Sequence, residues 1–239
     1  MASDKTNEAG FSDSSLDSEA SEKQTGTGVD VEGVDKESTT VFYLLRHGEC
    51  EGGKILRGHT DVAGSQTGRA QMQSSVDHLI TSHNLEFEQI FSSPLRRCSE
   101  FALSLYLQLG APLKLEEGFK EINFGDWDGE TLASLYETQA SQIEQYWKNP
   151  WAITPPNGET MHEFESRVDA SWQSILSEHQ GKTVLVVTHG GVMRHLMARA
   201  LGVSGVAGFY TQLALDYASV VKITVYTSPE GSYYPQLHW

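Results

Sequence analysis

With 239 residues and a net charge of −15, the chain is long enough for one sizeable core and too acidic to favour nucleic acids or anionic membranes as partners. Its two cysteines, Cys50 and Cys98, are too few for a disulfide framework and favour a reducing compartment. No segment approaches the roughly 18 consecutive apolar residues of a membrane-spanning helix, so we expect no membrane span.

Residues 1–39 form an acidic tail. Residues 1–40 contain ten acidic residues against three lysines, with Phe11 as the only aromatic residue. This composition cannot bury enough apolar surface to offset the entropy lost on ordering, so we expect a disordered tail. Its simplest interpretation is a solvating tail, and the alternative is a regulatory or docking role. The tail lacks the basic and apolar regions of a secretory signal and is too acidic for a mitochondrial transit peptide, which predicts a cytoplasmic protein.

The remaining domain, residues 40–239, alternates between strand and helix patterns. The run 41–45 (VFYLL) is typical of a strand buried on both faces. Apolar residues at helical spacing predict a helix over 68–84, and a short strand follows at 87–93. We expect the next helix, 94–109, to open with its proline in the first turn and, being apolar on most sides, to be buried.

The middle of the chain holds two helices separated by an irregular segment. A short strand at 113–117 precedes a loop over 118–129, which three glycines predict. A helical pattern over 130–147 is followed by a Pro-rich excursion at 149–159. Apolar residues then recur at helical spacing over 160–179, which predicts an amphipathic helix.

The last part of the chain returns to strands. A strand is expected at 183–188, a helix at 191–201, and a final hairpin over 219–227 and 232–239. Strands that alternate with helices of this length argue for an α/β fold with a mostly parallel sheet flanked by helices.

Two of the apolar strands end in histidines. The first runs into Arg46 and His47, and the strand 183–188 runs into His189. In open α/β sheets ligands bind beyond the carboxyl ends of the strands, where the strand order reverses. The sequence therefore predicts one site that both histidines share.

The residue types at this predicted site suit phosphoryl transfer. Guanidinium groups, here Arg46 and Arg97, match phosphate oxygens bidentately. A histidine among cations has a lowered pKa and keeps a neutral nitrogen free to attack, which fits His47 or His189. A carboxylic acid, for which Glu121 is the candidate, could protonate the leaving oxygen.

Four motifs that carry these residues closely resemble the histidine phosphatase superfamily, which has the phosphoglycerate mutase-like three-layer fold. They are LLRHGE (44–49), SSPLRRC (92–98), FKEINFGDWDGE (119–130) and VVTHGGV (186–192). The resemblance spans roughly residues 41–225. The order of the four motifs makes it specific, whereas RHG alone would be weak.

The resemblance implies a role for each matching position. His47 resembles the nucleophile that becomes phosphohistidine. Arg46, Arg97 and His189 resemble the phosphate pocket, in which the second histidine also stabilises the pentacovalent transition state. Glu121 resembles the general acid that protonates the leaving alkoxide and then activates water. The family uses no metal and no cofactor, and the implied partner is a small-molecule phosphomonoester.

Within the superfamily the chain resembles the α-ribazole-5′-phosphate phosphatases of cobalamin assembly. The shared features are GDW at 125–127, the tryptophans Trp147 and Trp151 before PPNGE (155–159), and LRGHTDV at 56–62. The tryptophans could stack on a flat base or could equally be core anchors under an insertion. A broad-specificity phosphatase is the main alternative. Mutases carry a longer insertion before the last histidine, and a phospho-ligand-binding pseudo-phosphatase would typically lack one catalytic group.

Several further residues are candidates to line the phosphate or substrate pocket: Gly190, Arg57, Cys50, His59 and Glu159. Cys50 departs from the Thr or Ser that the family usually has after RHGE, and small-residue packing is the simpler interpretation of it. We expect no metal site, because no metal-ligand spacing occurs and neighbouring arginines would repel a cation.

Other positions have simpler interpretations. Arg96 is expected at the surface, and Glu117 and Asp126 are the alternatives to Glu121 if the register is shifted. The segment 63–65 departs from the family's PLT but keeps Ser65, whose hydroxyl can cap a helix. The remaining histidines are interpreted as ordinary surface or helix residues: His78, His83, His162, His179, His195 and His238.

Overall fold

The computed structural model describes residues 37–238, so nearly all of the predicted tail lies outside the described residues. The elements in chain order are β1 (Ser38–Arg46), α1 (Gln66–His83), β2 (Gln89–Ser92), α2 (Arg96–Leu109), β3 (Leu113–Leu115), η1 (Glu117–Phe119), η2 (Gly125–Trp127), α3 (Leu132–Lys148), α4 (Met161–Glu178), β4 (Thr183–Thr188), α5 (Gly190–Leu201), α6 (Ala207–Gln212), β5 (Val220–Thr227) and β6 (Tyr233–His238).

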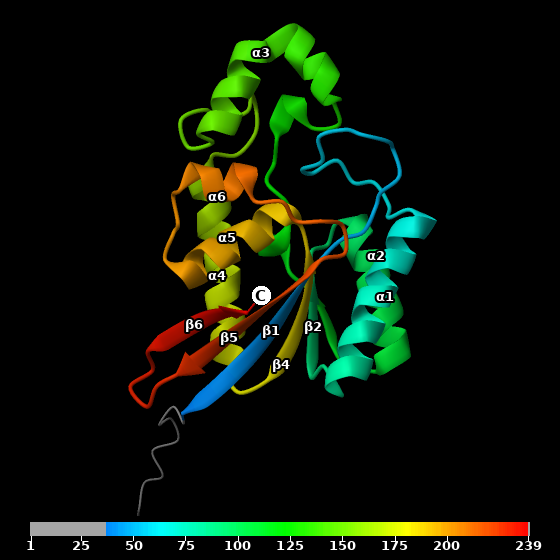
Figure 1. Ribbon diagram of the computed structural model, residues 1–239, viewed down its shortest axis with the longest axis vertical. Helices are drawn as coiled ribbons and strands as arrows, with labels where there is room; N and C mark the ends of the chain where they lie inside the picture. Colours follow the sequence, from blue (N-terminus) through cyan, green and yellow to red (C-terminus); the bar gives the residue numbers. More distant parts are fainter. Residues whose placement is uncertain (1–36, 239) are drawn as a thin grey trace, which may run out of the picture. The chain divides into compact units, whose positions relative to one another are not determined.

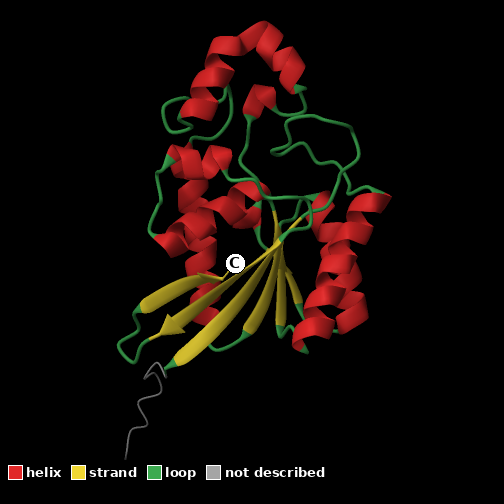
Figure 2. Ribbon diagram, viewed as in Figure 1, coloured by secondary structure: helices red, strands yellow, loops and turns green. Residues whose placement is uncertain are grey.

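Within the described residues, six strands form one sheet in the order β3-β2-β4-β1-β5-β6 (Figure 1). Strands β1 to β4 are parallel to their neighbours in that group, whereas β5 pairs antiparallel with β1 and β6 antiparallel with β5. Helices cover both faces (Figure 2). The predicted α/β class with a mostly parallel sheet is therefore confirmed, including the final hairpin.

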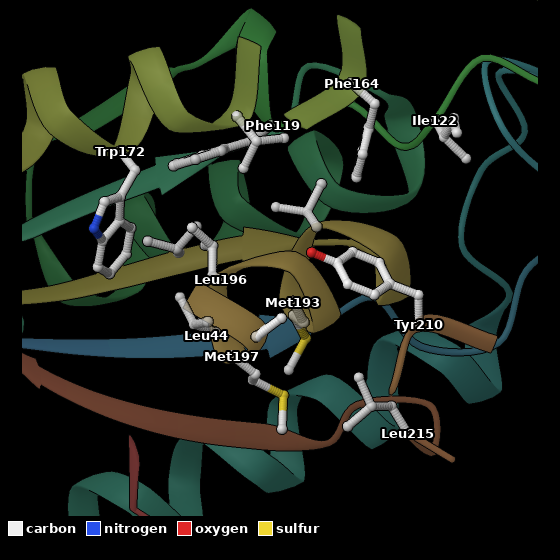
Figure 3. Packing of buried hydrophobic residues seen from close by; sticks show 14 of the residues in the cluster. Leu44, Phe119, Ile122, Phe164, Trp172, Met193, Leu196, Met197, Tyr210 and Leu215 are labelled. Atoms are coloured by element: carbon white, nitrogen blue, oxygen red, sulfur yellow. The ribbon is translucent and has the colours of Figure 1, made fainter. Parts of the chain in front are cut away.

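The strands are buried on both faces because successive side chains point to opposite sides. In β1, Phe42 and Leu44 pack with α4 and α5, whereas Tyr43 and Leu45 pack with α1 and α2. Figure 3 shows part of the first cluster, in which side chains of α5 lie among those of α4 and Leu44. This double burial fixes the register of β1, and with it the direction in which its last residues point.

Helix α2 differs from its prediction at both its start and its exposure. It begins at Arg96, and its N-cap Leu95 has an extended conformation, so Pro94 precedes the helix instead of occupying its first turn. One face, including Phe101, is buried, but the outer face exposes Leu103, Tyr106 and Leu107. The expectation of a fully buried helix is therefore wrong, because α2 covers an outer face of the sheet and has solvent on its other side.

The connections also contain structure that the sequence patterns did not indicate. The predicted loop 118–129 holds the end of one short 3₁₀ turn, η1, and the whole of another, η2. Helix α6 was not predicted, since six residues are too few to show a helical period. Helix α3 deviates from helical geometry at Gln139, and it lies beyond the carboxyl end of the sheet, next to α6 (Figure 1). Ser65 caps α1, as expected, by accepting from Gly68 N–H at 2.9 Å.

The strand order places the predicted site. Because β1 pairs in parallel with β4, Arg46 lies opposite Thr188, and the two strands end side by side. The N–H of His47 donates to the Thr188 carbonyl at 2.9 Å, which brings His47 next to His189. None of the helices within residues 37–238 is long and apolar enough to cross a membrane.

Candidate active site

His47 directly follows β1 and is fixed in one tautomer. Its Nδ1 lies 2.8 Å from the carbonyl oxygen of Gly48. Because a carbonyl only accepts, the ring proton is on Nδ1, and the lone pair is on Nε2. The pKa of this ring is lowered to about 3, first by burial and then by the positive charges of Arg97, Arg46 and Arg57. His47 is therefore a neutral base with a free nitrogen at pH 7.

His189 packs against His47 with a ring-centroid distance of 5.3 Å and is fully buried. Its Nδ1 accepts a hydrogen bond from Nε of Arg97 at 3.2 Å, so its own proton is on Nε2, which donates to Ser93 Oγ at 2.7 Å. Burial, followed by the charge of Arg97, lowers the pKa of His189 well below its usual value. Both histidines are thus held uncharged, and each has a defined orientation.

Arg97 and Asp128 hold the loop 58–60 between them. Arg97 is only 1% exposed, and it donates from Nη1 to the carbonyl of Thr60 at 3.0 Å and from Nη2 to that of Gly58 at 2.6 Å. Asp128 accepts from three successive N–H groups of the same loop at 2.6 to 2.9 Å. The loop therefore links the arginine motif to the segment that carries Glu121.

Arg46 brings a second guanidinium to the same edge of the sheet. Its Nη1 donates to the carbonyl of Leu215, and its guanidinium carbon lies 4.6 Å from the ring centre of Tyr217. The Tyr217 ring is also 5.8 Å from that of His47. Among the described residues the buried Nε of Arg46 has no hydrogen-bond partner. A guanidinium with an unused donor beside a neutral histidine is suited to binding an anion.

Arg57 and Cys50 lie in the loop after His47. Arg57 Nη2 donates to the carbonyls of Glu51, at 2.9 Å, and of Gly53. Cys50 Sγ lies 3.4 Å from Nδ1 of His47, and burial raises the pKa of this thiol. Cys50 is therefore a neutral packing partner of the histidine, whereas Arg57 adds positive charge while binding its own loop.

Glu121 supplies a carboxylate at the start of α5. Its Oε2 accepts from the N–H of Gly191 at 3.0 Å, and its Oε1 accepts from the N–H of Ile122 at 3.1 Å. A Cβ atom at Gly191 would lie 2.2 Å from Oε1, so only glycine permits this approach. The positive end of the α5 dipole also faces this carboxylate.

The backbone around Glu121 is held by a partly buried ion pair. Arg167, on α4, binds the carboxylate of Glu159 through two N–H groups and donates to three backbone carbonyls of residues 118–121. His59 Nε2 donates to the Glu121 carbonyl at 2.9 Å. Glu159 and His59, which were candidates to touch substrate, thus bind the loop that carries the carboxylate.

A cavity of about 100 Å³ opens beside Glu121. Its walls are mainly aromatic and apolar, and Arg194 is the other charged residue in them. The aromatic and thioether side chains in the lining are Phe124, Tyr146, Trp147, Met161, Phe164 and Tyr210. Trp147 therefore faces the cavity, whereas Trp151 packs on Tyr210 with its Nε1 donating to Glu165 at 3.1 Å. The second tryptophan is an anchor of the fold.

The alternatives to Arg97 and Glu121 lie elsewhere. Arg96 is exposed and pairs with Glu100, Glu117 pairs with Lys120, and Asp126 accepts from Asn157. The structure instead brings together, at the carboxyl ends of β1 and β4, the five principal candidates: Arg46, His47, Arg97, Glu121 and His189. Gly190 begins α5 directly after His189. Among residues 37–238, no group of three or more His, Cys, Asp or Glu side chains is arranged to hold a metal ion.

Several residues of the site were not found from the sequence. Asp128 stands inside the quoted GDWDGE motif, and Arg194 follows Gly190 by one helical turn, so both had a sequence signal that was not used. Arg167 and Tyr217 had none, because only the fold brings them to the site. His195, interpreted as an ordinary helix or surface residue, is instead buried and hydrogen-bonded through its two ring nitrogens.

Comparison with known proteins gives relatives of several activities. Over 186 residues the chain is 30% identical to the adenosylcobalamin/alpha-ribazole phosphatase of Escherichia coli, covering 76% of this chain and 89% of that protein. It is 28% identical to the phosphoglycerate mutase of Schizosaccharomyces pombe over 201 residues, covering 81% and 92%. The relatives thus include both a phosphatase and a mutase.

A solved structure and a family model also match the chain. The solved structure of Bacillus stearothermophilus YhfR superposes with a TM-score of 0.73 at 26% identity, covering 83% of this chain and 96% of that one. The family model described as histidine phosphatase superfamily (branch 1) matches residues 42–230. That match covers most of the chain and includes all four motifs. The chain therefore belongs to the histidine phosphatase superfamily.

Proposed function

We propose that this protein hydrolyses a phosphomonoester through a phosphohistidine formed on His47. The observation that carries this proposal is the state of His47, a neutral ring whose Nδ1–H is bound to Gly48 and whose Nε2 lone pair is unprotonated. Guanidinium groups on one side and the Glu121 carboxyl on the other supply the charge and the proton that the reaction needs.

The first step transfers the phosphoryl group to the enzyme. The Nε2 lone pair of His47 attacks phosphorus, an N–P bond forms, and the ester P–O bond breaks. The leaving alkoxide takes its proton from the protonated carboxyl of Glu121. The second step reverses these roles: the Glu121 carboxylate removes a proton from water, the water oxygen attacks phosphorus, and the N–P bond breaks. Inorganic phosphate leaves, and both residues return to their starting states.

The phosphate oxygens would be bound by Arg46, Arg97 and the first turn of α5 at Gly190. Arg46 has an unused donor, Arg97 is buried beside His189, and the α5 terminus presents backbone N–H groups. We assign His189 to the same pocket, where its Nδ1 accepts from Arg97 and so orients the guanidinium that stabilises charge in the transition state. Because these groups already supply positive charge, we propose a reaction without metal or cofactor.

α-Ribazole 5′-phosphate, an intermediate of cobalamin biosynthesis, is the substrate that we propose. Its flat benzimidazole base would stack on the aromatic rings that line the cavity beside Glu121, Trp147 among them. The 30% identical Escherichia coli relative is named for this activity. A broad-specificity phosphatase is the alternative within the same chemistry.

Arg194 favours a second candidate class, phosphomonoesters whose leaving group carries a carboxylate. Its Nε donates to the carbonyl of Leu213 at 2.9 Å, its guanidinium lines the cavity beside Glu121, and burial lowers its pKa. A guanidinium in this place can pair with a substrate carboxylate. 3-Phosphoglycerate carries such a group, and the Schizosaccharomyces pombe relative is named a phosphoglycerate mutase.

The test is phosphate release by the full chain, with and without EDTA. The panel contains α-ribazole 5′-phosphate, 3-phosphoglycerate, phosphoserine, glycerol 2-phosphate and p-nitrophenyl phosphate. A kcat/KM for α-ribazole 5′-phosphate a hundredfold above the others, equal to about 2.7 kcal/mol of selective transition-state binding, supports that substrate. Preference for the two carboxylates supports the second class, and flat activity supports the broad-specificity phosphatase.

Three further outcomes would contradict parts of the proposal. Conversion of 3-phosphoglycerate to its 2-phosphate isomer without phosphate release identifies a mutase. Binding of phosphate with no turnover of any ester identifies a pseudo-phosphatase. Loss of activity with EDTA overturns metal independence.

We also propose a cytoplasmic location, which fits the two free, buried cysteines.

A further inference from the structure

The strongest observation outside the reacting groups concerns Arg167, whose five N–H donors all have acceptors. Nη1 donates to the carbonyls of Gly118 at 2.9 Å and Lys120 at 2.7 Å, and Nη2 donates to that of Glu121 at 2.8 Å. Nε and Nη2 bind the two carboxylate oxygens of Glu159 at 3.0 and 2.6 Å. Three of these bonds end on the backbone that carries the proposed acid.

From this geometry we infer that Arg167 and Glu159 are positioning residues that hold the Glu121 carboxyl where it can protonate the leaving group. The inference rests on the proposed function, because it concerns the efficiency of that proton transfer. Neither residue lies in the lining of the cavity beside Glu121. Both act through the backbone, Arg167 from the amino-terminal side of Glu121 and Glu159 from the carboxyl-terminal side.

Glu159 extends this hold beyond the acid. Its Oε1 accepts from the N–H of Asn123 at 2.7 Å, and its own N–H donates to the Asn123 carbonyl at 3.0 Å. The ion pair therefore binds the backbone on both sides of Glu121, from Gly118 to Asn123. A bidentate arginine–carboxylate pair is rigid, and its side chains are only 25% and 14% exposed, so solvent screens it weakly.

The hydrophobic core anchors the two ends of the same segment. Phe119 is fully buried and Ile122 nearly so, and both belong to the hydrophobic cluster that contains the apolar side chains of α4; Figure 3 shows Phe119 beside α4 and Ile122 at the edge of the cluster. Their side chains fix where the segment lies. Arg167 fixes the orientation of the peptide groups between them, which decides where the Glu121 side chain points.

A small error in this orientation has a chemical consequence. Glu121 reaches Gly191 N–H at 3.0 Å, in a space so tight that a single added carbon would collide with it. A displacement of about 1 Å can cost 10²-fold in rate when a proton must be transferred in the transition state. An alkyl ester needs this proton because an alkoxide is a poor leaving group, whereas p-nitrophenolate leaves readily without it.

Lysine cannot replace Arg167 in this role. One ammonium group has three donors on a single nitrogen, so it cannot reach the carboxylate of Glu159 and three separate carbonyls at once. Arg167→Lys keeps the positive charge near the site and removes the fork. The variant therefore separates the orientation of the acid loop from the electrostatic effect of the charge.

The experiment measures kcat/KM of the full-length Arg167→Lys protein on two esters: p-nitrophenyl phosphate and the best alkyl ester of the substrate panel. The value of kcat/KM reports only the steps up to phosphorylation of His47. Hydrolysis of the phosphoenzyme, which both esters share, therefore does not affect the comparison. We expect kcat/KM for the alkyl ester to fall by a factor at least about tenfold larger than the factor by which kcat/KM for the aryl ester falls. Glu121→Gln should show the same selectivity more strongly.

The matched control is Arg199→Lys, an arginine on α5 that pairs with Asp169 and is not in the lining of the cavity. Its alkyl-to-aryl ratio should equal that of the unchanged protein. Glu159→Gln is the second test variant, since it keeps the shape of the pair and one acceptor oxygen. Glu159→Gln should lower kcat/KM for the alkyl ester more than kcat/KM for the aryl ester, but by a smaller factor than Arg167→Lys. If its melting curve shows that Arg167→Lys does not fold, Glu159→Gln is the variant that tests the inference.

The outcomes distinguish this inference from the proposed function. If kcat/KM falls equally on both esters, or does not fall, Arg167 and Glu159 are ordinary structural residues and the positioning role is overturned. An unchanged protein that releases phosphate from none of the esters overturns the proposed function itself, and the positioning role with it. A selective loss of the alkyl ester supports both.

Discussion

The two sides of the candidate site are built differently. On the phosphate side, His47 and His189 end two adjacent parallel strands, each buried on both faces, and their orientations follow from the sheet register. On the leaving-group side, Glu121 stands in a connection between two 3₁₀ turns, and Trp147 comes from the end of α3. The first side is fixed by the sheet and its register, whereas the second depends in addition on polar contacts between loops and helices.

The difference separates the reaction from its substrate. A phosphoryl group is the same in every phosphomonoester, so the groups that bind it can belong to the sheet that defines the fold. The leaving group differs from substrate to substrate, and its cavity is lined by loops, α3, α6 and the first turns of α4 and α5, of which the loops and α3 can change without disturbing the sheet. We therefore expect substitutions on the phosphate side to affect all substrates alike, and those on the other side to discriminate between them.

The largest effect should follow from His47→Asn. Without the Nε2 nucleophile, no phosphoenzyme forms, and kcat should fall at least about 10⁴-fold on every ester of the panel. Phosphate release and trapping of an acid-labile phosphoprotein by rapid quench would measure both effects. The control is His83→Asn at the exposed end of α1, which should retain full activity. Full turnover by His47→Asn would exclude the phosphohistidine mechanism.

A smaller loss is expected from Gly191→Ala. The added Cβ would lie 2.2 Å from Glu121 Oε1, so the carboxyl must move away from its N–H partner. This movement of the carboxyl should lower kcat/KM about 10²-fold on alkyl esters and less on p-nitrophenyl phosphate. Gly208→Ala in α6, whose Cβ would meet nothing closer than 3.7 Å, is the matched control. An active Gly191→Ala protein would show that the carboxyl is not held as tightly as its contacts indicate.

The same division explains what could be predicted from the sequence. The β1 and β4 runs, the helical spacing of α4 and the four motifs are local patterns, so the sheet, its faces and the residues at its edge were predictable. Arg167 was not, because its contacts join α4 to a loop about 46 residues earlier in the chain, and no local pattern records that meeting. Helix α6 was too short for a period, and the exposed face of α2 depends on what lies beyond it.

Acid should destabilise the phosphate side first. Folding lowers the pKa of His47 to about 3 and that of His189 also well below 6.5, so below pH 6.5 the unfolded chain binds protons that the folded chain does not. The contribution of these two histidines to the free energy of unfolding is therefore fully present above pH 6.5. As the pH falls from there towards the folded pKa, the free energy of unfolding decreases by about 1.4 kcal/mol per pH unit for each histidine.

Urea unfolding at pH 7.0 and 5.5 measures this effect, with the free energy of unfolding falling between them. His189→Asn should reduce the pH dependence, since it removes one of the histidines whose pKa folding lowers, whereas the exposed His83→Asn should keep it unchanged. Equal stability of the unchanged protein at both pH values would show that the two rings are not held neutral by the fold.

The smallest effect, and the most selective, should come from the tryptophans. Trp147 lines the leaving-group cavity, whereas Trp151 packs on Tyr210 and binds Glu165. Trp147→Leu keeps an apolar wall and removes the aromatic face, which should cost up to about tenfold in kcat/KM for α-ribazole 5′-phosphate. The same change should leave 3-phosphoglycerate unaffected, because that substrate has no ring to stack.

Trp151→Leu is the matched comparison and should lower the melting temperature without changing the ratio between substrates. If both tryptophan variants change the ratio equally, the cavity does not discriminate leaving groups through Trp147, and the aromatic lining is a part of the core. If only Trp147→Leu changes it, the end of α3 determines specificity while the sheet edge supplies the reaction. The second result would establish that the two sides of the site can be altered independently.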